Sequence, residues 1–245
     1  KLDFVGKVLN SYTQHTKLDV NAPSISIVDK FHYDHVGRLT KHTQIIGTQA
    51  EEVISENTYD ELGQLQIKSV GGKLTQSRLQ NIDYQYNIRG WLTEINNTNL
   101  LSDDLFAFKI NYNRVDHSGT KLYNGNISET EWRTKNDNTL RWYRYTYDPL
   151  NRIKTAIDKD NRYSLSSVSY DKNGNITALE RRGHRNSSAT SFGIMDRLQY
   201  TYASRSNRLT RVQELMGGSL NYGFKNGSNS TTEYTYDTNG NLLRD

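Results

Sequence analysis

The densest group of potential metal ligands in the sequence is His32, Asp34, His35 and His42. Imidazole and carboxylate groups are common ligands of Zn²⁺ and related metals, so the group raises a metal site as a hypothesis. In a strand, however, His32 and His35 would point to opposite faces, and His35 falls in a predicted turn. We therefore interpret these residues as turn and surface residues, and we predict neither a metal site nor a bound cofactor.

Acidic residues stand close together in Glu51-Glu52, Asp103-Asp104 and Asp158-Lys159-Asp160. Glycoside hydrolysis needs two carboxylates fixed about 5–10 Å apart across a cleft, which neighbours in one segment do not show. A calcium loop beginning at Asp158 fails, because Tyr163 stands where Gly is needed and Ser169 where the bidentate Glu belongs. No nucleophile, base and orienting group converge in the sequence. We predict that the chain is not an enzyme and has no catalytic residues.

Two stretches mix basic and aromatic residues, as proteins that bind single-stranded nucleic acid do: Arg141-Trp142-Tyr143-Arg144-Tyr145 and Arg181-Arg182-Gly183-His184-Arg185. Alternation in the first stretch places its two tyrosines on one strand face and Trp142 with Arg144 on the other. The second stretch is predicted to be an exposed hairpin tip. The net charge is only 31 − 27 = +4, which is mild for 245 residues, so we predict no nucleic-acid partner.

The elements that position these residues follow from a repeated heptad, whose positions we number 1 to 7. It reads Tyr, Asp or Asn, two variable residues, Gly or Asn, one variable residue, and Leu or Ile. Seven copies begin at Tyr33, Tyr59, Tyr86, Tyr147, Tyr170, Tyr202 and Tyr236. The copy at Tyr202 carries one extra residue and has Ala203 at position 2. Leu2–Val8 fits the template from position 2 onward, and Tyr123–Ile127 is a shortened copy in the 61-residue gap that precedes Tyr147.

The chemistry of the heptad predicts a turn. Asp or Asn at position 2 can accept hydrogen bonds from backbone N–H groups two residues on. Gly at position 5 is the favoured last residue of a type I turn and tolerates a positive φ. Asn151 and Asn207 replace Gly at this position, and Asn is the next most tolerant residue in the left-handed region. We predict a left-handed backbone at both asparagines.

Strands are predicted on both sides of each turn. Aromatic residues recur at spacing two before the turns, which places both rings on one strand face. These pairs are Phe31 and Tyr33, Tyr84 and Tyr86, Tyr145 and Tyr147, Tyr200 and Tyr202, and Tyr234 and Tyr236. Phe106, Phe108, Ile110 and Tyr112 alternate in the same way, and residues 50–56 are too short for a convincing helix and are interpreted as strand. The sequence therefore predicts an all-β protein of tandem hairpins.

The composition favours thin, partly wet sheets over one thick apolar core. Hydrophobic residues make up 34% of the chain, below the usual range of roughly 45–50%. The 17 tyrosines each combine an apolar ring with a polar hydroxyl, which suits a half-buried surface. Because the chain has no cysteine, disulfides and thiolate metal sites are excluded. No signal peptide is visible, and no apolar run approaches the about 18 residues of a membrane span.

The heptad resembles the Tyr-Asp-x-x-Gly-Arg-Leu motif of the RHS/YD-repeat family, found in bacterial RHS toxins and in teneurins, over nearly the whole chain. The resemblance implies a long β-sheet that spirals into a curved, hollow shell around a C-terminal toxin domain, in a secreted or cell-surface bacterial protein. The family's shell closes with an Asp-Pro-x-Gly core segment, near which some members cleave themselves. Here the Asp148-Pro149 pair lies in a heptad turn and is followed by Leu150-Asn151, so self-cleavage is not carried over to any residue.

These observations predict that residues 1–245 form a single YD/RHS-repeat array cut from a longer protein. Its expected role is a non-catalytic wall whose partners are the rest of the shell and an enclosed toxin. Eight units are too few to close a shell, so we expect the isolated chain to associate through exposed strand edges. The alternative is a cell-surface module that binds glycans or partner cells through outward rings such as Trp91 and Trp142. The glycosylation sequons, for example at Asn96, Asn126 and Asn226, are interpreted as ordinary polar turn residues.

Overall fold

The computed structural model describes residues 1–16, 24–216, 222–227 and 230–244, and all regular structure in these ranges is β-strand. The strands are β1 (Asn10–His15), β2 (Ile25–Tyr33), β3 (Leu39–Ile46), β4 (Glu52–Tyr59), β5 (Leu65–Val70), β6 (Gln80–Tyr86), β7 (Leu92–Ile95), β8 (Phe106–Asn111), β9 (Glu129–Thr134), β10 (Arg141–Tyr147), β11 (Ile153–Asp158), β12 (Leu165–Tyr170), β13 (Ile176–His184), β14 (Phe192–Tyr202), β15 (Leu209–Glu214), β16 (Thr235–Tyr236) and β17 (Leu242–Arg244). The all-β prediction is confirmed: β8 forms where Phe106, Phe108 and Ile110 alternate, and β4 covers most of residues 50–56, which were interpreted as strand.

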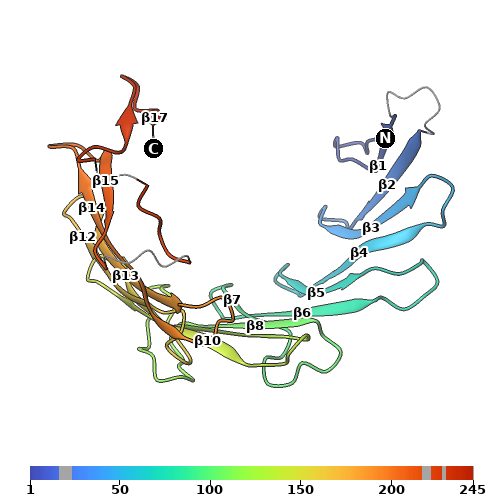
Figure 1. Ribbon diagram of the computed structural model, residues 1–245. Helices are drawn as coiled ribbons and strands as arrows, with labels where there is room; N and C mark the ends of the chain where they lie inside the picture. Colours follow the sequence, from blue (N-terminus) through green and yellow to red (C-terminus); the bar gives the residue numbers. More distant parts are fainter. Residues whose placement is uncertain (17–23, 217–221, 228–229, 245) are drawn as a thin grey trace. The chain divides into compact units, whose positions relative to one another are not determined.

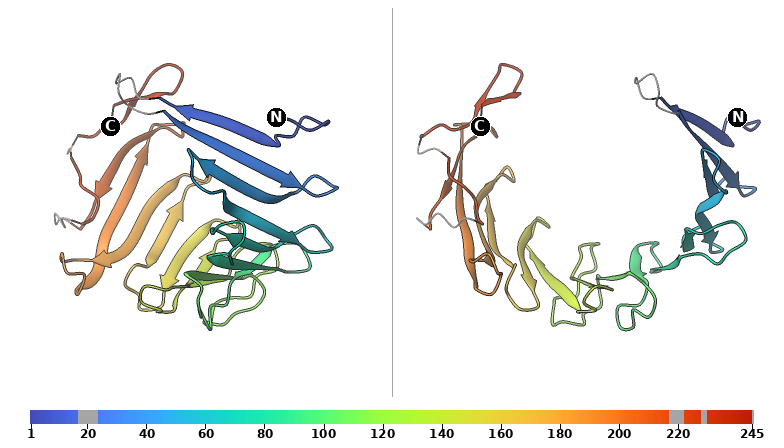
Figure 2. Two further views of the ribbon diagram at one scale, coloured as in Figure 1. Left: turned by 90° about the vertical axis from the view of Figure 1, so that its right-hand side faces the viewer. Right: turned by 45° about the vertical axis from the view of Figure 1, so that its right-hand side comes forward.

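Hydrogen bonds join the strands in sequence order, from β1 to β15, and β16 pairs with β17 in a separate hairpin. The chain divides into two compact units, Lys1–Lys109 with Trp132–Leu140 and Ile110–Glu131 with Arg141–Asp245. Within the first unit β1 to β7 lie side by side in chain order, and within the second unit β10 to β15 do the same (Figure 1). Two further views show the same order inside each unit (Figure 2). Within each unit, each hairpin therefore lies beside the one that precedes it in the sequence.

Every complete heptad forms the predicted hairpin. The Tyr at position 1 pairs with the Leu or Ile at position 7, and the register shifts by a bulge at that Tyr each time. These pairs are Tyr33 with Leu39, Tyr59 with Leu65, Tyr86 with Leu92, Tyr147 with Ile153, Tyr170 with Ile176, Tyr202 with Leu209, and Tyr236 with Leu242. A type I turn followed by a left-handed residue is the usual three-residue hairpin loop, which accounts for the bulge in the six copies of seven residues.

Position 5 adopts the predicted left-handed backbone in six of the seven copies. The φ angle is +85° at Gly37, +92° at Gly174 and +63° at Asn151. The prediction for Asn207 is wrong, because the left-handed residue of that copy is Arg205, with a φ of +55°. The extra residue lengthens the loop, whose inner turn runs from Ala203 to Ser206 with a Ser206 N–H···O=C Ala203 bond of 3.1 Å. The strained backbone position therefore moves two residues toward the N-terminus.

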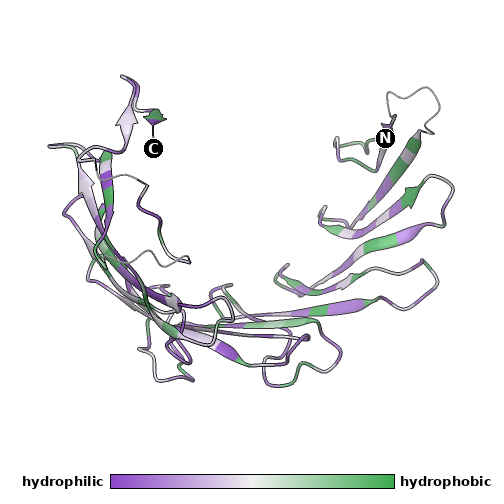
Figure 3. Cartoon of the chain, in the orientation of Figure 1, coloured by the Kyte–Doolittle hydropathy of each residue, from purple (hydrophilic) through white to green (hydrophobic). Residues whose placement is uncertain are grey.

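The sheets are a single layer with little interior. Among the described residues the buried apolar side chains are Val53, Leu101, Ala107, Ala156, Val168, Met195, Leu198 and Val212. Apolar and polar residues are interspersed along the strands of both units, with no thick apolar layer (Figure 3). Same-strand ring pairs contribute to the half-buried packing, since the Phe106 and Phe108 centroids lie 6.2 Å apart and the Tyr143 and Tyr145 centroids also lie 6.2 Å apart. The composition-based prediction of thin sheets holds.

Candidate functional site

The turns are the part of the molecule where polar side chains make the same contacts again and again. In the first complete heptad, Asp34 Oδ1 accepts hydrogen bonds from the backbone N–H groups of Val36 at 3.1 Å and Arg38 at 2.8 Å. Arg38 Nε also donates to Asp34 Oδ2 at 2.6 Å. Asp148 makes the same set of contacts with Leu150 and Arg152. The repeated aspartate therefore shapes its own turn.

These contacts change the acidity of the turn aspartates. Desolvation acts to raise the pKa of Asp34, but the backbone N–H and guanidinium of Arg38 hold it below its usual value of 3.8. The same balance lowers the pKa of Asp148. In Asp171 and Asp237 the first cause of the lowered pKa is the side-chain amide of Asn175 or Asn241. The folded protein therefore binds protons less readily at these sites than the unfolded chain.

Stability is expected to fall in acid. Because the folded pKa values are depressed, the carboxylates stabilise the fold fully above their ordinary pKa, and this contribution is lost as the pH falls below about 4. Urea midpoints measured between about pH 7 and about pH 3 should decrease in that window. Asp148→Asn is expected to flatten the decrease, because Asn87 shapes its own turn in the same way, accepting from Arg89 N at 2.9 Å and Trp91 N at 3.1 Å. Midpoints that do not change with pH would contradict this account.

In six of the seven complete copies, the tyrosine at position 1 connects the turn to the one before it. Its hydroxyl donates to the backbone carbonyl at position 7 of the preceding copy. The pairs are Tyr33 to Val8 at 3.0 Å, Tyr59 to Leu39 at 2.8 Å, Tyr86 to Leu65 at 3.0 Å, Tyr147 to Ile127 at 2.8 Å, Tyr170 to Ile153 at 2.7 Å and Tyr202 to Ile176 at 2.8 Å. Val8 and Ile127 belong to the two incomplete copies, which confirms their alignment with the heptad. We call these contacts, with the cation contacts described next, the turn ladder.

At four junctions a Lys or Arg side chain at position 6 adds a second contact between consecutive turns. The Arg38 guanidinium lies 4.6 Å from the ring centroid of Tyr59, and that of Arg152 lies 4.5 Å from Tyr170. Lys7 over Tyr33 and Arg208 over Tyr236 repeat the arrangement at 5.4 Å and 5.8 Å. An exposed cation–π contact contributes about 0.5–1 kcal/mol. The ladder is therefore a chain of small contacts between neighbours, typical of a repeat protein.

The same arrangement of strands occurs in known proteins. Two crystal structures, TcdB2-TccC3-TEV and TcdB2-TccC3-Cdc42, each match with a TM-score of 0.60 over 87% of this chain, at 16% sequence identity. TcdB2-TccC3 is a Tc toxin that contains an RHS-repeat shell. This chain has an RHS-repeat fold. It spans 11% of the length of the chains it matches. No family model and no curated protein matches the sequence.

Within this RHS-repeat fold, two charged residues of the described part of the chain are only 1% exposed, Asp196 and the larger Glu129. Its Oε1 accepts from the backbone N–H groups of His117 at 3.0 Å and Gly119 at 2.7 Å. Its Oε2 accepts from Asp116 N at 2.6 Å and from Asn111 Nδ2 at 3.2 Å. Burial acts to raise the pKa of Glu129, but these donors hold it below its usual value of 4.5. A carboxylate held in this way anchors a loop and is a poor general base.

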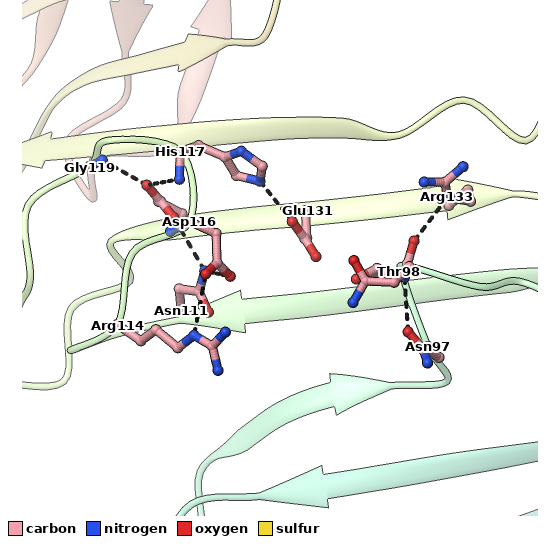
Figure 4. A network of polar contacts seen from close by, with 11 residues as sticks. Asn97, Thr98, Asn111, Arg114, Asp116, His117, Gly119, Glu131 and Arg133 are labelled. Carbon is pink, nitrogen blue, oxygen red and sulfur yellow. Dashed lines mark hydrogen bonds and ion pairs between the residues drawn. The ribbon is translucent and has the colours of Figure 1, made fainter.

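The loop that Glu129 holds also carries His117, whose Nε2 lies 2.7 Å from Glu131 Oε2 (Figure 4). The His117 ring stacks on Trp142, with centroids 4.7 Å apart and planes at 7°. Trp142 was expected to be an outward ring, but this contact covers one of its faces and leaves it half-buried. In the other unit, Arg133 Nε donates to the Thr98 carbonyl at 2.9 Å, which fixes the loop after β7 (Figure 4). The contacts of His117 and those of Arg133 therefore both hold loops that connect strands.

The structure separates the potential metal ligands. His42 Nε2 lies 2.9 Å from Asp29 Oδ1, and its ring stacks on Phe31 with centroids 4.5 Å apart. Asp34 is occupied by its own turn. Across residues 1–16, 24–216, 222–227 and 230–244 no three His, Cys, Asp or Glu side chains lie close enough to hold a metal ion.

The acidic groups also have separate roles. Glu51 Oε2 pairs with Lys30 Nζ at 2.7 Å and Oε1 accepts from Thr43 Oγ1, and these partners lower the Glu51 pKa. Asp158 accepts from the backbone N–H groups of Arg162 at 3.1 Å and Tyr163 at 3.0 Å, so it caps a turn where the calcium loop was considered. Burial, with the charges of Asp83 and Asp103, raises the pKa of Asp104. Glu51 and Asp158 therefore stabilise local structure.

The two basic and aromatic stretches lie in strands β10 and β13. The expected face alternation in the first is confirmed by the stacked pair Tyr143 and Tyr145. The second was expected at a hairpin tip, but 181–184 lie within β13, and the tip is the 185–191 connection to β14. Strand pairing with β14 explains the difference, since His184 still pairs with Phe192.

The sequons have different surroundings. Asn96 is 8% exposed, accepts from Asp83 N at 2.8 Å and donates to the Phe106 carbonyl at 2.8 Å, so it is a buried structural residue. Asn126 donates to Asn151 Oδ1 at 3.1 Å. The Ser of the Asn226 sequon lies outside the described residues. The turn interpretation therefore needs one correction: Asn96 fastens neighbouring strands, because its buried amide satisfies backbone groups on both sides.

Proposed function

We propose that this chain is a segment of an RHS wall that encloses or presents a C-terminal toxin or effector domain. The observation that carries the proposal is the turn ladder. In six of the seven complete copies the tyrosine hydroxyl bonds the preceding copy, so the sheet extends by repeating the same contact and needs no second layer. Such a design suits a thin barrier. The partners would be the remaining repeats of the wall and the domain behind it.

The proposal includes one array over residues 1–245 and no catalytic role. The ladder contacts recur within both compact units, which supports a single repeating architecture. The carboxylates that could serve as acids or bases are held by turns or loops, as Asp148 and Glu129 are. The isolated chain is still expected to associate through its strand edges, and Tyr12 on β1 is 70% exposed.

The similarity to toxin complexes supports a secreted or cell-surface location in a bacterium, which is part of the proposal. Among the described residues no helix is long and apolar enough to span a membrane. A glycan-binding role for the indole rings receives less support. Trp142 stacks on His117, and the Arg89 guanidinium lies 5.1 Å from the Trp91 ring centroid. Both rings therefore already have a partner on one face.

The wall proposal is tested on the full-length protein from which the chain comes. A domain carried behind the wall should resist limited proteolysis in the wild-type protein. Tyr170→Ala with Tyr202→Ala removes two consecutive ladder contacts and should expose that domain to cleavage. Tyr12→Ala, at an exposed tyrosine outside the heptads, is the matched control and should leave it protected. A domain cut equally fast in all three proteins, or a parent protein without such a domain, would overturn the proposal.

A further inference from the structure

A row of exposed apolar side chains follows the heptad turns of the first unit. Four turns contribute to it: the incomplete one near the N-terminus and the three that connect β2 to β3, β4 to β5 and β6 to β7. We call this set the apolar turn row; its members are Phe4, Val5, Val36, Leu62 and Ile88, all of them exposed. Phe4 and Ile88 are fully exposed, and Leu62 is 85% exposed. The wall function makes no use of the row, because the ladder contacts of this unit come from heptad positions 1, 6 and 7.

The four turns follow one another along one edge of the unit, as the turns after β2 and β4 show (Figure 1). A side chain of each turn lies against the glycine of the next, and these contacts are Lys7 with Gly37, Arg38 with Gly63, and Gln64 with Gly90. Neighbouring strands lie about 4.8 Å apart, so the turns repeat about every 10 Å and the row is about 30 Å long. Single exposed apolar residues are normal on a soluble protein, whereas a contiguous set is typical of an interaction site.

The turn itself does not require apolar side chains at these places. The row occupies positions 3 and 4 of the heptad, whereas the turn is defined by Asp or Asn at position 2 and the left-handed residue at position 5. In the second unit the last three heptads carry polar residues instead, namely Lys172, Asn173, Ser204, Arg205, Thr238 and Asn239. Only the heptad at Tyr147 keeps an exposed aliphatic side chain there, Leu150. The contiguous row is therefore a property of the first unit and not of the motif.

The charges around the row do not favour a charged partner. The four turns carry three basic and four acidic residues, which are Lys7, Arg38, Arg89, Asp3, Asp34, Asp60 and Glu61. Asp34 pairs with Arg38, and the Arg89 guanidinium lies over the Trp91 ring. A net charge of −1 gives no attraction to nucleic acid or to an anionic membrane surface. An apolar and nearly neutral row fits a partner surface of the same kind.

We propose that the apolar turn row joins two copies of this chain, packed antiparallel about a two-fold axis. In such an isologous contact the same surface serves on both sides. The first turn of one copy faces the fourth turn of the other, so Phe4 and Val5 pack on Ile88 of the second copy. The second turn faces the third, so Val36 packs on Leu62 of the second copy. Every apolar side chain of the row then meets another apolar side chain.

The exposed charges select the antiparallel direction. A parallel arrangement would place Glu61 of one copy against Glu61 of the other, and like charges in contact are unfavourable. The antiparallel arrangement places Glu61 beside His35 of the second copy, and both residues are exposed in the single chain. An imidazole can donate a hydrogen bond to a carboxylate in either of its charge states.

The area of the row suits a weak, closed dimer. An aromatic side chain such as Phe4 offers about 150–250 Å², and the five side chains together offer on the order of 500 Å². Two rows packed together would bury about 1,000 Å², which is the lower limit for a specific interface. The dissociation constant is therefore expected to be on the order of 10 μM.

The first test uses cysteine crosslinking, because the chain has no cysteine of its own. Under mild oxidation, an equimolar mixture of Val36→Cys and Leu62→Cys should form a mixed disulfide dimer, identified by its intermediate mass. Each variant alone should crosslink at least about tenfold more slowly. In the antiparallel dimer each of these positions lies about 10 Å along the row from its own equivalent, and a disulfide spans at most about 7 Å between Cα atoms.

The matched control is Asn173→Cys, at position 4 of a heptad in the second unit. Mixed with either row variant, it should crosslink no faster than the single variants do. Equal rates for the mixture of Val36→Cys with Leu62→Cys and for the separate variants would overturn the antiparallel dimer. Equally fast crosslinking of Asn173→Cys would overturn it as well, since contact would then not be confined to the row.

The second test measures the association constant by analytical ultracentrifugation. Leu62→Glu with Ile88→Glu should raise the dissociation constant of the dimer at least about tenfold and leave the urea midpoint unchanged, because both side chains are exposed in the single chain. Leu150→Glu makes the same kind of change at an exposed turn position of the second unit and should leave the dimer as it is. Head-to-tail association through strand edges would instead give species that grow with concentration and persist in the double variant.

A double variant that dimerises as the wild type does would overturn the proposal. So would a chain that shows no dimer but binds phosphatidylcholine vesicles and loses that binding in the double variant, since the row would then be a lipid-contacting surface. The protease experiment on the wall does not depend on these outcomes, so either proposal can fail alone.

Discussion

Glu129→Gln is expected to lower the free energy of unfolding by about 2–4 kcal/mol, since it breaks a buried charged hydrogen-bond network. Both carboxylate oxygens accept from N–H donors: Oε1 from His117 and Gly119, and Oε2 from Asp116 and Asn111. An amide in either orientation would place its NH₂ group against one of these donor pairs. The side chain is buried, so water cannot easily take over the lost contacts. Urea denaturation of wild type and variant measures the difference.

The matched control for this change is Glu61→Gln, which makes the same substitution at an exposed turn position. It should alter stability by less than about 0.5 kcal/mol, as surface changes usually do. Amide hydrogen exchange should also accelerate at residues 116–119 in Glu129→Gln and stay unchanged in the control. Equal stability of the two variants would show that the Glu129 contacts do not hold the loop.

The hairpins could be predicted from the sequence because their determinants are local. Asp34, Gly37 and Arg38 lie within five consecutive residues, and they define the turn by bonds to one another. The contact that favours tyrosine at position 1 is harder to recognise in the sequence. Its hydroxyl partner lies 17 to 26 residues away in the chain, as Tyr170 to Ile153 and Tyr202 to Ile176 show. The pattern predicted a half-buried ring, and the structure adds the bond that makes tyrosine better than phenylalanine there.

The role of Glu129 could not be predicted, because the sequence carries no signal for it. Its strongest donors are backbone N–H groups of residues 116, 117 and 119, and any residue type can supply those. The stacking of His117 on Trp142 is hidden for the same reason, since it depends on how the loop returns to β10.

Asn207 shows how a correct rule can be applied to the wrong residue. The preference of Asn for a left-handed backbone is sound, but the extra residue in this copy moves that backbone to Arg205. Asn207 is used through its side chain, whose Oδ1 accepts from Asn173 Nδ2 at 3.1 Å and Asn175 Nδ2 at 2.8 Å. Loop length therefore decides which residue adopts the left-handed backbone. Alignment to the heptad shows that the loop is one residue longer, but it does not show which residue becomes left-handed.

Gly174→Val is expected to cost about 2 kcal/mol, because a β-branched residue is strained at positive φ. The φ of Gly174 is +92°, and an added Cβ would meet no atom within 4 Å, so the cost comes from the backbone alone. Lys172→Val, in the same turn at an exposed position, is the control and should cost much less. Urea denaturation compares the two variants, and equal losses would show that position 5 imposes no backbone requirement.

The reciprocal substitution tests the same cause in the opposite direction. Arg205→Gly should raise stability by up to about 1 kcal/mol, because Gly removes the strain of a side chain at a φ of +55°. Asn207→Gly should give no gain, since Asn207 is not left-handed and would lose its bonds to Asn173 and Asn175. If Asn207→Gly raised the free energy of unfolding and Arg205→Gly did not, the left-handed residue would be Asn207, as the heptad alignment predicted. The opposite outcome would establish that one inserted residue displaces the strained position while leaving the hairpin and its ladder contact intact.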